Sequence, residues 1–138
     1  MRTLLKNKQK MKYSLPIGEE PIINYYEDED GTKYPLETGE SEMVYEKPVE
    51  FMNGISGKLS EILVEAFGIN DTSLYAQMDY MAHEFPFKTG TLIWKNSEVG
   101  YKNPEKTKPN KTTADYEIVG ILDEYPNQWS CLLKRILK

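Results

Sequence analysis

Residues that could carry catalysis are few and lie far apart in this sequence. His83 is the only histidine and Cys131 the only cysteine, which excludes a Cys/His zinc site and an internal disulfide. A Cys–His nucleophile would require these two residues to meet, and a buried structural thiol is the commoner state of a lone cysteine in a strand. His83 stands just before Phe85 and Pro86, so we expect it at the surface or at a strand end.

Two further motifs come close to known sites without matching them. The segment Gly54-Ile55-Ser56-Gly57 lacks the residue between serine and the second glycine that a nucleophile elbow needs. Residues 26–37 space their acids and a glycine almost as a calcium loop does, but tyrosine occupies the first ligand position and no helices flank the segment. The 22 acids ensure neighbouring carboxylates, yet nothing marks a catalytic pair. We therefore expect no enzyme activity, metal, cofactor or small-molecule substrate, and rank an enzyme with an unmarked carboxylate site last.

Length and composition favour one sheet-rich domain. The 138 residues suit a single domain, and the ten tyrosines and eight prolines favour strands and turns over a helical bundle. A formal net charge of −5 is the opposite of what a general nucleic-acid coat carries. The first residues hold no apolar run long enough for a signal peptide, and no segment reaches the length of a membrane span. We expect a protein made and kept in a cytoplasm, or packed into a particle assembled there.

The charges are strongly segregated along the chain. Residues 1–12 carry five basic side chains and no acid, whereas residues 19–50 carry eleven acids against Lys33 and Lys47. The stretch 95–111 is positive again, with five lysines against Glu98 and Glu105. Such runs are most often solvated surface. The functional interpretation is that basic and acidic segments meet on neighbouring copies of the protein, where charge fixes register.

Periodicity and turn residues place the elements that would carry these charges. Asp30-Gly31 predicts a hairpin turn, and Thr38-Gly39-Glu40 predicts a second turn. Pro48 indicates an edge or a bend in the strand around it. Apolar residues in 57–67 recur with helical spacing, with Ser56 as a candidate cap and Gly68 at the end.

The second half of the chain predicts further strands. Residues 74–83 fit both a strand and a helix, and we favour the strand. Residues 91–94 predict a short strand, 96–113 a long polar loop, and 115–136 a hairpin. Together the patterns predict a mainly β fold: a small antiparallel β-barrel or sandwich with long loops and one short helix over 57–67. We divide the chain into a basic N-terminal arm, residues 1–15, and a single β-rich domain, residues 16–138, with an extended loop at 96–113.

The order of several short segments resembles that of small neck proteins of tailed bacteriophages, in particular siphophages and prophages of Gram-positive bacteria. The segments that carry the resemblance are 1–10, 45–51, 55–57, 66–68 before Tyr75, 91–94, 114–119 and 132–135. Each is short, and their order and spacing together make the likeness. It covers most of the chain.

The resemblance implies a head-closure, or head-to-tail connector, protein. Such a protein is a small β-barrel that assembles as a homo-oligomeric ring below the portal and its adaptor, seals the DNA-filled head and docks the tail. It would reside in the neck of the virion after synthesis in the bacterial cytoplasm, and DNA would pass its channel without specific binding. The family offers no catalytic residues. By position, the contacts between copies and with neighbouring rings would come from the basic arm and the loop, namely Arg2, Leu4, Leu5, Lys6, Lys8, Lys10, Lys12, Lys102, Lys106, Lys108 and Lys111. The helical period over 57–67 departs from an all-β description.

A small nucleic-acid-binding β-barrel module is the alternative. It would combine the basic arm with Tyr13, Tyr25 and Tyr26 as stacking residues for single strands. The acidic tract of residues 19–50 lies next to these tyrosines and weighs against this function.

Overall fold

The computed structural model describes residues 8–137, except for the side chains of residues 23, 24 and 37. Within that range the chain is mainly β, with a curled, half-barrel sheet and a single short α-helix. The elements follow in the order β1 (Gln9–Ser14), β2 (Pro16–Glu27), β3 (Lys33–Tyr45), β4 (Val49–Asn53), α1 (Glu61–Phe67), η2 (Thr72–Leu74), β5 (Tyr75–Met81), β6 (Leu92–Trp94), η3 (Lys111–Thr113), β7 (Tyr116–Leu122) and β8 (Gln128–Arg135).

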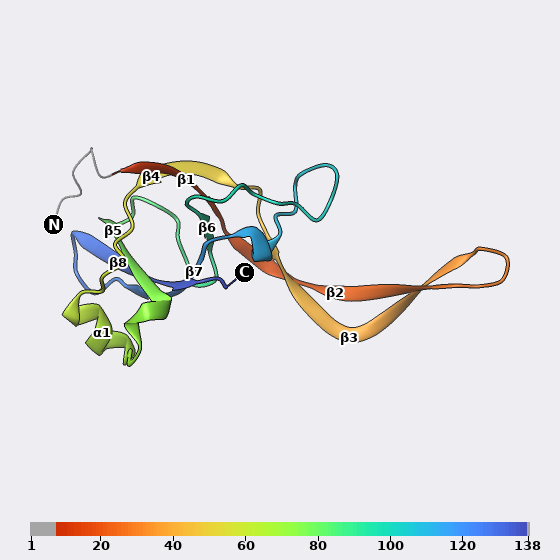
Figure 1. Ribbon diagram of the computed structural model, residues 1–138, viewed down its shortest axis with the longest axis horizontal. Coiled ribbons are helices and arrows are strands. Elements are labelled where there is room, and N and C mark those ends of the chain that lie inside the picture. Colours follow the sequence, from red (N-terminus) through yellow and green to blue (C-terminus); the bar gives the residue numbers. More distant parts are fainter. Residues whose placement is uncertain (1–7, 138) are drawn as a thin grey trace.

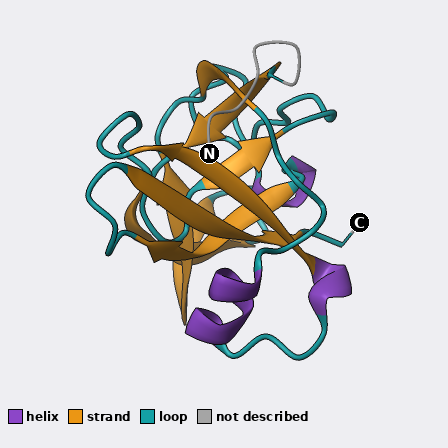
Figure 2. Ribbon diagram, turned by 90° about the vertical axis from the view of Figure 1, so that its left-hand side faces the viewer, coloured by secondary structure: helices purple, strands orange, loops and turns teal. Residues whose placement is uncertain are grey.

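Six of the strands form one antiparallel sheet, and the other two form a separate hairpin. The sheet has the order β4-β1-β6-β7-β8-β5, and β2 pairs only with β3. Figure 1 shows the curled sheet as the body of the molecule and the β2–β3 hairpin leaving it along the long axis. Seen along that axis, the strands of the body wrap around one interior, and α1 lies at its margin (Figure 2).

Aromatic side chains fill the inside of the curled sheet. Tyr13, Phe51 and Phe87 meet edge to face, with ring centroids 5.1 to 5.5 Å apart. Tyr80 and Phe85 extend this cluster, while aliphatic residues such as Ile118 close it from the opposite strands. Because side chains alternate between the faces of a strand, β7 buries every second residue at its start. The expectation of a mainly β fold with one short helix is confirmed.

The helix is present but begins four residues later than the sequence predicted. The Ser60 hydroxyl caps it by accepting a hydrogen bond from the Leu63 amide at 3.3 Å, and Gly68 ends it with a φ of 62°. Ser56 is not the cap, because its backbone exchanges hydrogen bonds with Gln77 of β5 at 2.8 and 2.9 Å. This pairing keeps the chain extended up to the start of the helix.

The turn expected at Thr38-Gly39-Glu40 is wrong. Strand β3 runs through these residues, which bulge opposite Ile22 between the pairs Pro21↔Ser41 and Ile23↔Glu37. Gly39 takes a φ of 79°, and the Thr38 hydroxyl donates to the Ile22 carbonyl at 3.0 Å. The positive φ of this glycine is accommodated by two extra residues in the strand, so the hairpin continues instead of folding back.

The other predicted elements are confirmed. The turn at Asp30-Gly31 joins β2 and β3, and residues 74–83 contain the strand β5. Pro48 lies between β3 and the edge strand β4, and the last two strands form the hairpin predicted for 115–136. The polar loop at 96–113 has no strand, but it includes η3 and a bridge between Tyr101 and Pro109. None of the helices in the described part of the chain is both long and apolar enough to cross a membrane.

The prediction of a basic N-terminal arm over residues 1–15 is wrong for the second half of that range. Residues 9–14 form β1, which lies inside the sheet between β4 and β6. Met11 and Tyr13 point into the core while Lys10 and Lys12 point outward, which is the alternation of a strand with one buried face. Residues 1–7 of that arm lie outside the described part of the chain.

Candidate functional site

The most prominent feature of the surface is the β2–β3 hairpin, which we call the arm (residues 16–45). Its strands are 12 and 13 residues long. At about 3.3 Å per residue, the arm is roughly 40 Å long. Figure 1 shows that it carries its turn far from the curled sheet. Because most of the arm lies outside the core, core packing does not explain its length.

The base of the arm is fixed to the body by packing and by charge. Tyr45 is buried against Leu92 and Trp94, and the Glu46 amide donates to the Leu15 carbonyl at 2.8 Å. The loop at 96–113 lies beside the base, where it forms ion pairs between Lys102 and Glu42 at 2.7 Å and between Lys108 and Glu20 at 3.6 Å. Exposed pairs of this kind contribute little stability individually, but they fix the loop beside the arm.

The far end of the arm, residues 25–36, is the arm tip, and Asp28 organises its turn. Its carboxylate accepts hydrogen bonds from the amides of Thr32 at 2.9 Å and Asp30 at 3.0 Å, and from the Tyr34 hydroxyl at 3.1 Å. The bond from Thr32, helped by those from Tyr34 and Asp30, lowers the pKa of Asp28. Gly31 supplies the positive φ of 81° that closes the turn. The tip is therefore ordered by its own residues.

The arm tip combines exposed aromatic side chains with carboxylates. Tyr25 is 67% exposed and Tyr26 57% exposed, although tyrosine usually buries most of its ring. Tyr26 lies opposite Tyr34 in the hairpin, and Leu36 follows on the same face. Glu29 and Asp30 add exposed negative charge at the turn. Apolar area presented in this way at the end of an extended element is typical of a binding surface.

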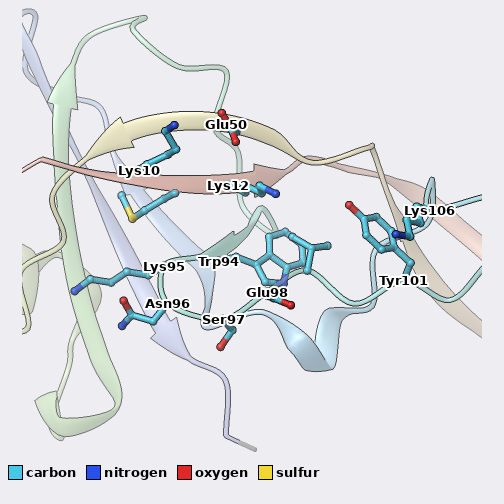
Figure 3. A pocket seen from close by; sticks show the side chains of 12 residues that line it. Lys10, Lys12, Glu50, Trp94, Lys95, Asn96, Ser97, Glu98, Tyr101 and Lys106 are labelled. Carbon is cyan, nitrogen blue, oxygen red and sulfur yellow. The ribbon is translucent and has the colours of Figure 1, made fainter.

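A second feature is a hollow of about 470 Å³ beside β1 and β6, which we call the lysine-lined hollow. Lysines from two parts of the chain line it, together with Glu50 of the edge strand β4 and with Trp94, Glu98 and Tyr101. Figure 3 shows these side chains around the opening. The four lysines are Lys10, Lys12, Lys95 and Lys106. With two glutamates against four lysines, the hollow has a net positive charge.

Asp115 shapes one wall of this hollow. Its Oδ2 accepts hydrogen bonds from the amides of Lys95, Asn96 and Ser97 at 2.8 to 3.0 Å, and its Oδ1 accepts the Ser97 hydroxyl at 2.7 Å. Burial would raise the pKa of Asp115, but these hydrogen bonds outweigh burial and hold the pKa well below its usual range. The charged carboxylate thus holds the chain in place as it leaves β6.

The contact residues predicted from the sequence fall into three groups. Arg2, Leu4, Leu5 and Lys6 lie outside the described residues. Lys8 precedes β1, while Lys10, Lys12 and Lys106 line the hollow. The remaining three form ion pairs within the chain, namely Lys102 with Glu42, Lys108 with Glu20, and Lys111 with Glu117. Part of the charge pairing expected between copies is therefore made inside one copy.

The residues considered for catalysis lie in ordinary structural positions. Burial raises the pKa of the Cys131 thiol to about 12, so this thiol stays protonated at neutral pH. His83 is exposed beyond β5 and packs against Trp129, with ring centroids 4.5 Å apart. In a second hollow, Ser130 donates to Asp79 at 2.6 Å, and no histidine lines that hollow. No group of three or more potential metal-ligating side chains occurs within the described residues.

Sequence reasoning missed the lysine-lined hollow because its walls are distant in the chain. Lys12 is paired with Trp94, which lies 82 positions later in the sequence, and no local pattern indicates this contact. Comparison with protein-family models, curated proteins and solved structures gives no match for the chain.

Proposed function

We propose that this protein is a structural subunit of the neck of a tailed bacteriophage, a head-closure protein that forms a homo-oligomeric ring between the portal–adaptor assembly and the tail. It would reach the virion neck from the bacterial cytoplasm and act without catalysis. The observation that carries the proposal is the arm, a hairpin about 40 Å long that exposes tyrosines at its end. Such an element suits contact with another protein subunit.

The charge of the molecule supports the same function. A ring around DNA should not hold phosphate, because each neutralised phosphate adds salt-dependent affinity that would hinder passage. The formal net charge of −5 meets this condition, and three of the lysines in the predicted basic loop are already paired with glutamates of the same chain. We therefore propose that DNA passes without specific binding.

Reconstitution with the neighbouring neck proteins tests the proposal. The purified chain is mixed with the portal–adaptor complex encoded in the same genome, and the products are weighed by native mass spectrometry. A head-closure protein adds several copies to that complex as one defined assembly. A chain that stays free at every concentration tested would remove the basis for this function.

The alternative, a nucleic-acid-binding module, is favoured by one observation, the lysine-lined hollow. Of the tyrosines expected to stack on bases, Tyr13 is buried in the core and cannot do so. Tyr25 and Tyr26 are exposed, but at the acidic arm tip. Titration of a labelled single-stranded oligonucleotide at low salt separates the functions, since micromolar binding with a steep salt dependence would favour the alternative.

A further inference from the structure

We propose that the arm tip of one copy docks into the lysine-lined hollow of the next copy. This inference rests on the proposed assembly of copies into a ring and names the contact that would build it. The two surfaces belong to the same chain, so every copy can give a tip and receive one.

Charge complementarity is the first argument. Glu27, Glu29 and Asp30 at the tip form no ion pair with any described residue. The same holds, within residues 8–137, for the four lysines of the hollow. Residual charge of opposite sign at two distant places on one surface favours their meeting on different copies, where it steers encounter and fixes register.

The base of the arm gives an example of the same kind of contact. There, Lys102 and Lys108 already pair with Glu42 and Glu20, which face each other across the hairpin. The arm therefore presents acids to lysines along its length. At its base the partner is the loop of its own chain, and at its tip the described part of the chain provides none.

Reach and shape exclude docking of the tip into the hollow of its own copy. The tip lies roughly 40 Å from the base of the arm. The arm also points away from the body that contains the hollow (Figure 1). The hollow's volume of about 470 Å³ lies within the range of pockets that hold ligands. Tyr26 and Tyr34 would pack against Tyr101 and the aliphatic stems of the lysines, while the carboxylates meet their ammonium groups.

The contact is heterologous, because a tip meets a hollow instead of another tip. Heterologous contacts generate closed rings when the rotation between copies closes, and open filaments when it does not. A ring built in this way leaves no tip or hollow unoccupied. A heterologous contact is compatible with the proposed neck function. It differs from the contact in a symmetric dimer joined arm to arm.

Charge reversal on each side tests the docking directly. The tip variant is Glu29→Lys/Asp30→Lys, and the hollow variant is Lys10→Glu/Lys95→Glu, both at positions whose side chains form no ion pair among the described residues. The control for the tip is Asp123→Lys/Glu124→Lys, two adjacent exposed acids in the turn between β7 and β8. The control for the hollow is Lys58→Glu/Lys88→Glu, two exposed lysines outside it. Circular dichroism verifies that each variant folds.

Sedimentation velocity of the full-length proteins at low salt is the measurement. The wild-type chain and both controls should associate with rising concentration, while the tip and hollow variants should associate at least about tenfold more weakly. An equimolar mixture of the tip and hollow variants should recover assembly, because native tips find native hollows and reversed tips find reversed hollows. Recovery in the mixture is a result that misfolding or general charge effects would not give.

The remaining outcomes overturn the docking and separate it from the neck function. If the tip and hollow variants each form assemblies of the same mass as the wild type, the contact between copies lies elsewhere. That result would leave the neck function standing. A wild-type chain that stays monomeric yet joins the portal–adaptor complex would also end the docking proposal alone. Failure in both assays would remove both proposals. If the hollow variant loses only oligonucleotide binding, the hollow serves nucleic acid instead.

Discussion

At the scale of single residues, Asp115 shows how one carboxylate can shape a surface it does not belong to. Three consecutive amides and one hydroxyl converge on it, so the chain leaving β6 is held in a single conformation. Hydrogen bonds to a charged acceptor are roughly twice as strong as those between neutral groups. The position of Lys95 at the hollow therefore depends on a residue twenty positions later.

Replacing Asp115 should destabilise the protein in a pH-dependent way. Asp115→Ala should lower the free energy of unfolding at pH 7 by about 2 to 3 kcal/mol, because several charge-assisted hydrogen bonds are lost. The folded pKa of Asp115 is depressed, so its contribution is complete above the unfolded pKa of about 4 and is lost as pH falls toward the folded value. Urea denaturation at several pH values measures this effect. The gap between wild type and variant should narrow below about pH 4. Asp123→Ala is the control, because this exposed position in the turn after β7 should show little gap at pH 7.

Gly120 makes a second prediction at this scale. A Cβ at this position would lie 2.5 Å from the ring of Phe67, the last residue of α1. Gly120→Ala should therefore force the helix off β7 and cost about 1 to 3 kcal/mol of stability. Gly18→Ala is the matched control, since nothing lies within 4 Å of its Cβ and its φ is not positive. Thermal unfolding of the two variants gives the comparison, and an equal response in both would contradict the packing role of Gly120.

At the scale of elements, the sequence predicts the turns, helix ends and hairpins that are determined by residues close together in the chain. The turn at Asp30-Gly31, the helix ending at Gly68 and the hairpin after Asp115 all follow from local spacing, and all are present. Gly39 was misinterpreted because a positive φ serves a turn and a bulge equally well, and only pairing with β2 decides between them.

The sequence-based prediction of an N-terminal arm over residues 9–14, which form β1, is wrong for a related reason. Lysines at 8, 10 and 12 are typical of a charged N-terminal arm, but Met11 and Tyr13 have the period of a half-buried strand. That period was visible in the sequence. The hollow was not, because it requires β1 to pair with β6 and the loop after β6 to be held by Asp115. Contacts of this kind arise only from the folded topology.

The arm should be separable from the body. Glu19 and Met43 face each other across the hairpin, so replacing residues 20–42 with Asn-Gly leaves a two-residue turn between paired positions. The six-stranded sheet should keep its fold, because the replacement removes only exposed ion pairs of the arm base and leaves buried Tyr45 in place. We expect a melting temperature within about 5 °C of the wild type. Circular dichroism provides the measurement, and loss of the folded sheet would show that the arm is part of the folding core.

At the scale of the whole molecule, unpaired charges of opposite sign lie at two separate places on the described surface. The arm carries its acids away from the body, while the unpaired lysines of the described residues that line the hollow stay on the body. In a compact molecule, the acids and the lysines could pair within one copy. The elongated shape in Figure 1 keeps the arm tip far from the body, as the contact between copies that we propose requires.

The variant with Asn-Gly in place of residues 20–42, the armless variant, tests whether the tip of one copy contacts the hollow of the next. It keeps the hollow but has no tip, so in a heterologous assembly it accepts one wild-type tip and ends the growing chain. Adding it in rising proportion to the wild type should lower the mean assembly mass steadily, as measured by sedimentation velocity at fixed total concentration. In an assembly joined arm to arm, the armless chain has nothing to bind, and the wild-type assemblies would change only through dilution. A matched dilution with an unrelated protein of similar size measures that contribution. A mean mass equal to this control would show that the tip does not meet the hollow, whereas a steeper fall confirms that each copy offers one surface and receives the other.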